Sequence, residues 1–206
     1  MFDPPPRHAA DEPHPRVLII GTSCCGKTTF ARALAQARGC PVIDLDDHYW
    51  MPGWQARERD EFVQLVQAAA RGERWIAAGN YREVRPVLLA RASTVVWLDL
   101  GFMRVLSRGV LRSLRRAMAR EAVCNGNRES LRRAFLSHEG VVMWILATWH
   151  RRRREYGALR LAQGHGGPRW LAARTPREVR LLLEHLQGQA IPCDRAMDVI
   201  SNVPRS

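Results

Sequence analysis

Short apolar runs alternate along this chain with longer segments in which apolar residues recur at helical spacing. The short runs, which predict buried strands, cover residues 16–20, 41–46, 74–78, 94–98 and 168–174. The longer segments, which predict helices, cover residues 29–38, 57–71, 82–91, 102–120, 129–156 and 175–186. Buried strands that alternate with helices pair in parallel, so the pattern predicts an α/β fold with helices on both faces of one sheet.

The ends of the chain depart from this pattern. Residues 1–15 contain five prolines and are predicted to be disordered. The closing helix has a clear start, with Thr175 as N-cap and Pro176 in its first turn. We therefore expect one domain at residues 16–187, followed by a tail at residues 188–206.

The composition is that of an ordinary globular protein, with 46% hydrophobic and 25% charged residues. No apolar run approaches the roughly 20 residues of a membrane-spanning helix. The N-terminal residues are polar where a signal peptide is apolar, so we expect a cytoplasmic protein that does not act at a membrane. The five cysteines form no C-x-x-C pair, which excludes the usual patterns of a disulfide framework or a zinc site.

A glycine-rich segment between the first strand and the first helix matches the pattern G-x-x-x-x-G-K-[ST]. In such a loop, Gly21 and Gly26 allow backbone N–H groups to turn around a phosphate, and Lys27 reaches the outer phosphates. The hydroxyl of Thr28 would bind Mg²⁺. We predict that the loop binds ATP or GTP through the following residues: Gly21, Thr22, Ser23, Cys24, Cys25, Gly26, Lys27, Thr28 and Thr29.

Carboxylates follow the second predicted strand, at the edge of the sheet where the phosphate loop is expected. Asp44 and Asp46 are two residues apart and would share one face of a strand. Asp44 is predicted to support Mg²⁺ and Asp46 to orient or deprotonate an acceptor hydroxyl. The alternative is a solvated acid cluster at the end of the strand. The aromatic residues 48–54 that follow are predicted to form a loop.

The third strand ends in Gly79, Asn80 and Arg82, which we predict to bind substrate. Gly79 would permit close approach of a ligand, and Arg82 can make a forked contact to an anion. The alternative is an ordinary turn before a helix. Asp99, after the fourth strand, is a weaker candidate for a metal-supporting acid.

The charge of the chain is strongly positive, at +12, and Lys27 is the only lysine. Fourteen arginines and four acids lie in residues 101–160. We predict that the two basic helices in residues 104–156 form a lid over a triphosphate, where a few arginines neutralise charge on the transferred group. These catalytic candidates are Arg108, Arg112, Arg151 and Arg154. The alternatives are a solvated basic face, arginine usage set by genomic base composition, and a less favoured nucleic-acid surface.

The phosphate loop, the Asp44-Leu45-Asp46 segment, the aromatic residues 49–54, the segment 75–81 and the paired arginine-rich helices together resemble one family. The sequence resembles the adenylate-kinase-like P-loop proteins of the DNA topology modulation type over residues 16–187. It is similar, more distantly, to shikimate, gluconate and nucleoside monophosphate kinases.

This resemblance implies a three-layer α/β/α fold with a five-stranded parallel sheet of order 2-3-1-4-5, ATP with Mg²⁺, and a mobile lid. By position, Asp44 and Asp46 match the acid pair of shikimate kinases, and Arg82 matches an arginine of the monophosphate kinases. Arg174 lies in the loop that is beside the adenine in the family. The monophosphate kinases carry Asp before the position of Gly79, whereas this chain has Ala78.

Motifs and resemblance together predict a kinase that transfers the γ-phosphoryl group of ATP to a small-molecule or nucleotide acceptor. Two alternatives remain open at this point. One is a nucleotide-dependent regulator that binds nucleic acid, whose affinity would fall steeply with salt. The other is a slow ATPase that acts as a switch, with turnover that needs no acceptor.

Overall fold

The computed structural model describes residues 15–119, 122–123, 125, 127–128, 141–163 and 167–188. The predicted disordered segment therefore lies outside the described residues up to position 14, as does the tail from position 189. The elements, in chain order, are β1 (Arg16–Gly21), α1 (Lys27–Arg38), β2 (Val42–Asp44), α2 (Leu45–Tyr49), β3 (Trp50–Met51), the 3₁₀ turn η1 (Pro52–Trp54), β4 (Gln55–Ala56), α3 (Arg59–Ala69), β5 (Trp75–Ala78), α4 (Arg85–Leu89), β6 (Thr94–Leu98), α5 (Phe102–Ala119), β7 (Ala122–Val123), β8 (Asn127–Arg128), α7 (Val141–Ala162), β9 (Arg169–Ala173) and α8 (Pro176–Leu186).

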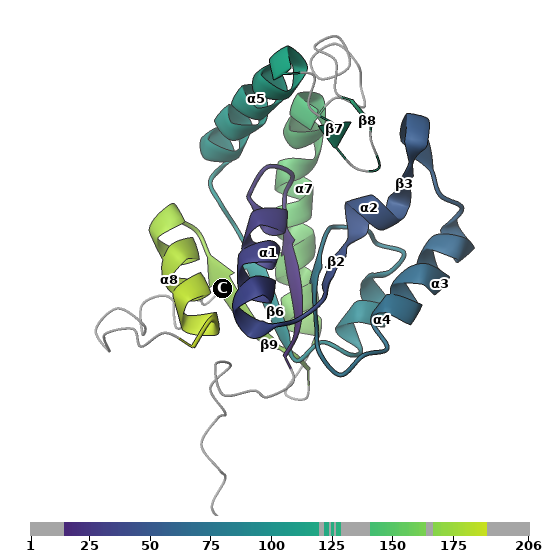
Figure 1. The fold of residues 1–206 in the computed structure, drawn as a ribbon. Helices are drawn as coiled ribbons and strands as arrows, with labels where there is room; N and C mark the ends of the chain where they lie inside the picture. The colour runs from purple at the N-terminus through teal and green to yellow at the C-terminus, as the bar shows by residue number, and fades with distance from the viewer. Residues whose placement is uncertain are drawn as a thin grey trace, which may run out of the picture.

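The core of the fold is a five-stranded parallel sheet of order β2-β5-β1-β6-β9 (Figure 1). Numbered by their order along the chain, these five strands have the predicted order 2-3-1-4-5, which is therefore confirmed. The strand β1 is central, with Ile19 opposite Ala78 of β5 and Gly21 opposite Leu98 of β6. The loop that follows β1 thus leaves the sheet between the ends of two neighbouring strands.

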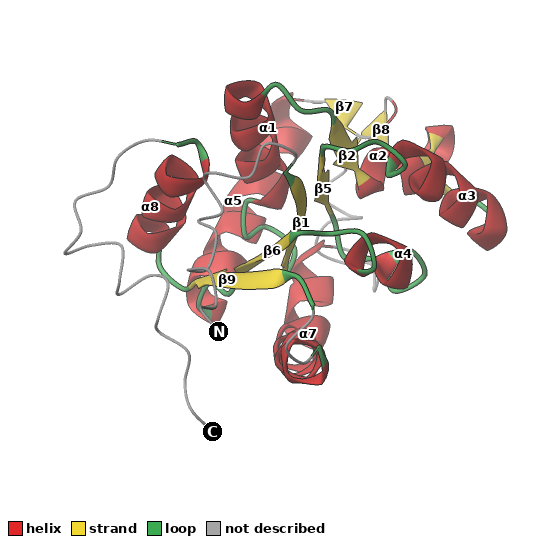
Figure 2. Ribbon diagram, turned by 90° about the horizontal axis from the view of Figure 1, so that it is seen from below, coloured by secondary structure: helices red, strands yellow, loops and turns green. Residues whose placement is uncertain are grey.

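Helices cover both faces of the sheet, which confirms the predicted three-layer arrangement (Figure 2). Alternate residues of β1 point to opposite faces, as a pleated strand requires. On one face, Val17 and Ile19 join a buried cluster with residues of α1 and α8. On the other face, Leu18 and Ile20 join a cluster with residues of α3, α4 and α7.

The predicted strand at residues 41–46 is wrong at its carboxyl end. The strand β2 stops at Asp44, and the chain turns at once into α2. The Asp44 side chain accepts a hydrogen bond from the backbone N–H of Asp46, which is the geometry of a helix N-cap. Because Asp44 caps α2, the strand ends there instead of continuing to residue 46 as the sequence pattern predicted. The predicted loop at residues 48–54 contains the end of α2 and a short hairpin, β3–η1–β4.

Other boundaries differ by smaller amounts. The helix predicted at residues 82–91 is the shorter α4, which has Pro86 in its first turn. The cap of α8 is as predicted, since the Thr175 hydroxyl accepts from the backbone N–H of Glu178. The helix predicted at residues 129–156 corresponds to α7, which extends to Ala162, and residues 129–140 of the predicted range lie outside the described part of the chain.

Helix α5 lies beyond the carboxyl end of the sheet, beside the first part of α7, and α7 continues along one face of the sheet (Figure 1). A Cβ atom on Gly109 of α5 would lie 2.8 Å from Ile145 Cδ1 of α7 and 3.4 Å from Cys24 Sγ. A larger residue at this position would have to displace the end of the Ile145 side chain, so glycine favours the close approach of α5 to α7. Among the described helices, none is both long and apolar enough to cross a membrane.

Candidate active site

The phosphate loop connects the end of β1 to the start of α1. Gly21 has a φ of 148°, and a Cβ atom there would lie 2.6 Å from the Leu98 carbonyl oxygen. Gly26 is the N-cap of α1 with a φ of 100°, and no side chain caps the helix. The first N–H groups of α1 therefore remain for an anion, and the helix dipole favours negative charge there.

Lys27 extends back along the loop. Its Nζ donates to the carbonyl oxygens of Gly21 at 3.0 Å and of Thr22 at 2.9 Å. An ammonium group has three N–H donors, so the third remains for an outer phosphate. The Thr22 hydroxyl is buried and has no hydrogen-bond partner among the described residues, so the loop keeps a further unused polar group.

The remaining loop residues differ in exposure. Cys25 is 1% exposed, and burial raises the pKa of its thiol, so the side chain remains neutral and serves as packing. Cys24 adopts the left-handed backbone conformation, with a φ of 63°. Ser23 and Thr28 are half-buried and Thr29 is exposed, so both residues that follow Lys27 lie at the surface of the first turn of α1.

Asp44 lies at the end of β2. One carboxylate oxygen caps α2, and the other lies 3.8 Å from Arg32 Nη2 of α1. Burial, together with the nearby charges of Asp46 and Asp47, raises the pKa of Asp44 to about 6. A cation at this position would relieve that repulsion, which suits a carboxylate that supports a metal.

Asp46 lies two residues further on, in α2 instead of on the strand. Its Oδ1 accepts a hydrogen bond of 2.7 Å from the Tyr81 hydroxyl. The two acids therefore do not share one strand face, and each has its own partner. Tyr81 was not among the predicted site residues, and the only signal for it in the sequence was its place directly after Gly79 and Asn80.

Aromatic rings form a wall beside Asp46. Tyr81 packs on Tyr49 at a ring-centroid distance of 4.6 Å and on Phe62 at 5.1 Å. Tyr49 contacts Trp50, which in turn contacts Trp54 at 5.6 Å. The hairpin after α2 thus places two indole rings on the acceptor side of the site.

Gly79 and Asn80, which were predicted to bind substrate, have internal partners. A Cβ atom on Gly79 would lie 2.5 Å from Leu45 Cβ, so the close approach at this glycine is that of α2. The Asn80 side chain accepts from the Gly21 N–H at 3.3 Å, and its amide nitrogen donates to the Gly21 carbonyl oxygen. Both residues therefore position the site, a role that the sequence analysis did not predict.

Arg82 contacts a carboxylate of α7. Its guanidinium makes a forked pair with Glu155 of α7, with distances of 2.9 and 3.0 Å, and Arg85 Nη1 binds the same carboxylate at 2.7 Å. Burial opposes ionisation of Glu155, but the hydrogen bonds from Arg82 and Arg85 lower its pKa to about 2. The forked contact predicted for Arg82 is thus made, in this structure, to Glu155.

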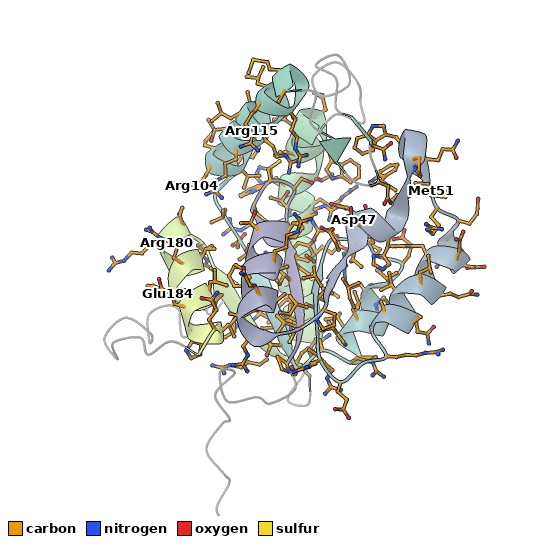
Figure 3. All side chains as sticks on the ribbon, in the orientation of Figure 1. Asp47, Met51, Arg104, Arg115, Arg180 and Glu184 are labelled. Atoms are coloured by element: carbon orange, nitrogen blue, oxygen red, sulfur yellow. The ribbon has the colours of Figure 1, made fainter. Side chains whose placement is uncertain are left out.

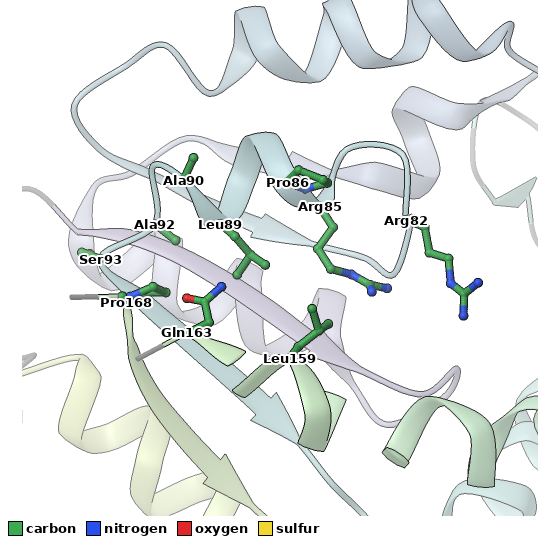
Figure 4. Close-up of a pocket in the computed structure, with 11 residues that line it drawn as sticks. Arg82, Arg85, Pro86, Leu89, Ala90, Ala92, Ser93, Leu159, Gln163 and Pro168 are labelled. Atoms are coloured by element: carbon green, nitrogen blue, oxygen red, sulfur yellow. The ribbon is translucent and has the colours of Figure 1, made fainter. Parts of the chain in front are cut away.

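The same two arginines border a groove of about 670 Å³ between α4 and α7 (Figure 4). The groove extends to Ser93 and Pro168, which precede the strands β6 and β9. No residue of the phosphate loop lines it. The groove therefore lies apart from the site at the carboxyl ends of the strands.

The lid helices present arginines to the rim, but not those predicted on α7. Arg152 Nη1 donates to the Asn80 carbonyl oxygen at 3.3 Å, and Arg153 Nε donates to Asp99 Oδ2 at 3.1 Å. Arg151 and Arg154 are exposed. On α5, Arg108 is exposed and Arg112 is half-buried.

The side chains of α5 and α2 lie on opposite sides of the start of α1 (Figure 3). Arg104 and Arg115 project from α5, whereas Asp47 and Met51 lie on the side of α2 (Figure 3). The basic helix α5 and the acid-bearing helix α2 thus lie on either side of the phosphate loop.

Asp99 has more contacts than its low rank in the sequence analysis suggests. Its side chain is 5% exposed, and besides Arg153 it lies 3.7 Å from Arg174 Nε. Burial raises the pKa of Asp99, and the charge of Arg153 opposes that effect. Asp99 directly follows β6, so it joins a lid arginine to the predicted adenine loop beside the phosphate loop.

Comparison with known proteins agrees with this architecture. The family model for isopentenyl transferases matches residues 16–49, which include the phosphate loop and the acid-bearing helix α2. The shikimate kinase of Rhodopirellula baltica is 31% identical over 106 residues, which cover 43% of this chain and 56% of that protein. The chain thus matches just over half of the length of that relative.

One solved structure shares the fold at low sequence identity. The shikimate kinase from Bacteroides thetaiotaomicron superposes with a TM-score of 0.50 at 13% identity, covering 83% of this chain and 95% of that one. A gluconokinase from Sinorhizobium meliloti matches with a TM-score of 0.47 at 16% identity, covering 84% and 90%. The predicted resemblance to the adenylate-kinase-like P-loop kinases is confirmed.

Proposed function

We propose that this chain, which has the fold and the phosphate loop of the adenylate-kinase-like P-loop kinases, transfers the γ-phosphoryl group of ATP to a hydroxyl or phosphate oxygen of a small acceptor. The observation that carries the proposal is the hydrogen bond between Asp46 and Tyr81 at the same rim of the sheet as the phosphate loop. A carboxylate oriented in this way is suited to take a proton from an acceptor.

The phosphate loop fits a triphosphate. The uncapped first turn of α1 and the Lys27 ammonium provide donors at the loop, where negative charge is favoured. Mg²⁺ usually keeps several waters and takes one or two protein oxygens besides the phosphates, so Thr28 and Asp44 suffice to hold it. ATP with Mg²⁺ supplies the phosphoryl group and a metal charge that offsets the charge on its oxygens.

The two carboxylate oxygens of Asp46 have different roles in the proposed reaction: one is oriented by the protein, and the other accepts a proton. The Tyr81 hydroxyl binds Oδ1, which leaves Oδ2 to accept the proton of an acceptor hydroxyl. Tyr81 is itself held between Tyr49 and Phe62, so the carboxylate keeps its direction before an acceptor arrives. Such preorganisation lowers the barrier because little rearrangement is needed at the moment of reaction.

The lid arginines provide positive charge on the opposite side. We assign this role to Arg108 and Arg112 of α5 and to Arg152 and Arg153 of α7, which already contact the rim. Arg151 and Arg154 are exposed in this structure, and they would reach the transferred phosphoryl group only if the lid changed its position. Charge that neutralises the transferred group in a site closed to water accounts for a large part of catalysis in phosphoryl transfer.

The test is a coupled assay of ADP release with ATP and Mg²⁺, alone and against pools of nucleoside monophosphates, nucleosides and hydroxylated carboxylic acids. Acceptor-dependent ADP in one pool, absent from Lys27→Ala protein purified identically, supports the proposal and narrows the acceptor. ADP release that is equal in every pool and without acceptor would indicate an ATPase. ATP binding without any ADP release would instead direct the search to nucleic acid, with affinity measured as a function of salt.

A further inference from the structure

Two asparagines, Asn125 and Asn127, contact residues 47–54. The antiparallel pair β7–β8, which we call the lid hairpin, lies between α5 and α7 in the chain. Asn127 is 4% exposed, and its side chain lies against η1, the turn between β3 and β4. Its Oδ1 accepts from the Trp54 N–H at 2.8 Å, and its Nδ2 donates to the Met51 carbonyl oxygen at 3.0 Å. Both polar ends of this buried amide are therefore satisfied by one turn.

Asn125 binds the residues before that turn. Its Nδ2 donates to the Asp47 carbonyl oxygen at 2.8 Å and to the Trp50 carbonyl oxygen at 2.6 Å. Asp47 lies in α2, directly after Asp46. Asn125 has a φ of 55°, a conformation that asparagine adopts more readily than most residues. The two asparagines thus hold the acid-bearing helix and the hairpin after it.

The turn between β3 and β4 depends on such support. Gly53 and Trp54 both have a positive φ, of 77° and 60°. A left-handed conformation costs a tryptophan more than a glycine, so the surrounding contacts must hold it. The Trp54 N–H donates to Asn127 within this turn, so the hydrogen bond acts at the residue with the unfavourable conformation. The asparagine therefore stabilises the conformation that places the Trp54 ring beside Trp50.

We propose that Asn125 and Asn127 are positioning residues that lock residues 47–54 in place when the lid hairpin docks, so that the acceptor site is complete only with the lid closed. The consequence for the acceptor rests on the proposed function. Because the four hydrogen bonds go to backbone atoms, docking does not depend on which side chains occupy residues 47–54. The side chains there, including Trp50 and Trp54, are free to select the acceptor.

Amide hydrogen exchange tests the docking without any assay of activity. The full-length protein with Mg²⁺ and a non-hydrolysable ATP analogue is compared with Asn127→Ala and Asn125→Ala. Loss of the side-chain acceptor of the Trp54 N–H predicts exchange about tenfold faster in peptides spanning residues 50–56 for Asn127→Ala. Peptides of β1 and β6 should not change. The control variant is Gln64→Ala, which truncates an exposed amide on α3.

Two results of the exchange experiment would overturn the proposal. One is unchanged exchange at residues 50–56 in Asn127→Ala. The other is faster exchange throughout the protein, β1 and β6 included, in both asparagine variants, because that pattern indicates a general loss of stability. Asn125→Ala removes only hydrogen bonds of an exposed side chain, so it keeps the test informative where Asn127→Ala unfolds.

A kinetic measurement tests the consequence for the acceptor. Asn127→Ala should raise the KM for the acceptor about tenfold while the Kd for the ATP analogue stays within about twofold of the original. An unchanged acceptor KM with weakened nucleotide binding would contradict the proposed role. If the unmodified protein phosphorylates no acceptor, the proposed function fails, whereas the exchange experiment still decides whether the asparagines hold residues 47–54.

Discussion

The side-chain amide of Asn80 hydrogen-bonds to both backbone polar groups of Gly21, the first residue of the phosphate loop. The pairing of β5 with β1 ends at Ala78 opposite Ile19, and the Asn80 side chain continues it by two residues. The loop therefore begins from a fixed backbone. Arg152 of the lid donates to the Asn80 carbonyl oxygen, so the same residue connects the loop to α7.

Replacement of Asn80 should weaken nucleotide binding. Asn80→Ala leaves two backbone groups of Gly21 without their partners, at a cost of about 1–3 kcal/mol for each buried group that water does not reach. We expect about tenfold weaker binding of an ATP analogue by calorimetry and a lower Tm. Equal affinity in Asn80→Ala and in the control Gln64→Ala would show that the loop does not need this support.

Lys27→Ala should abolish ATP binding and leave the fold intact. Among the described residues, the lysine ammonium donates to the Gly21 and Thr22 carbonyl oxygens, so its loss removes positive charge from the loop without a cavity in the core. We expect binding weaker by about a hundredfold or more and an unchanged circular dichroism spectrum. Undiminished ATP affinity would disprove the assignment of the phosphate loop.

Asp46→Asn should lower phosphoryl transfer by about a hundredfold or more and spare ATP binding, because an amide cannot take the acceptor proton. Tyr81→Phe keeps the carboxylate but removes the hydrogen bond that orients it. It should therefore lower kcat less than Asp46→Asn does. Steady-state kinetics with the identified acceptor measure both effects, and full activity of Asp46→Asn would move the base to Asp44 or to none.

Asp99→Asn should weaken the contact between residue 99 and Arg153 of α7. The amide keeps the shape of the side chain but loses the charge that holds Arg153 and lies near Arg174. We expect a kcat reduced about tenfold, with less change in the acceptor KM, because Arg153 then spends less time at the rim. The control is the ion pair between Arg57 and Glu61, which lies on α3. Glu61→Gln removes the charge of that pair and should leave kcat unaltered.

Stability at low pH should depend on Glu155. Its pKa is about 2 in the folded protein against an ordinary value of 4.5, so its contribution is complete above pH 4.5 and is lost as the pH falls towards 2. Glu155→Gln should lower the free energy of unfolding at pH 7 by about 1–2 kcal/mol, because Arg85 loses the negative charge of its hydrogen-bond partner. Urea unfolding at pH 7 and pH 3 checks this, since the difference between the two proteins should shrink at pH 3.

The order of strands and helices follows from local patterns. Buried parallel strands need continuous apolar runs, and the glycine-bounded loop before a helix is a local motif, so Gly21, Lys27 and the succession of elements along the chain were predictable. The order of the strands within the sheet was implied by the family resemblance instead. The cap at Thr175 was predictable for the same reason, because a helix N-cap depends on residues within one turn. The end of β2 was not, since Asp44 fits both a strand end and a helix cap, and the cap is the conformation that forms.

Which residues meet at the site depended on the tertiary structure. The sequence by itself determined the phosphate loop, the acids after the second strand and the basic helices, because each is a pattern within a few neighbouring residues. It did not determine that Tyr81 orients Asp46, that Asn80 fixes Gly21, or that Arg152 and Arg153 face the rim in place of Arg151 and Arg154. The residues of the first two pairs lie far apart in the chain, and which arginines of α7 reach the rim depends on how that helix is rotated about its axis. Packing against the sheet decides both the pairing and the rotation.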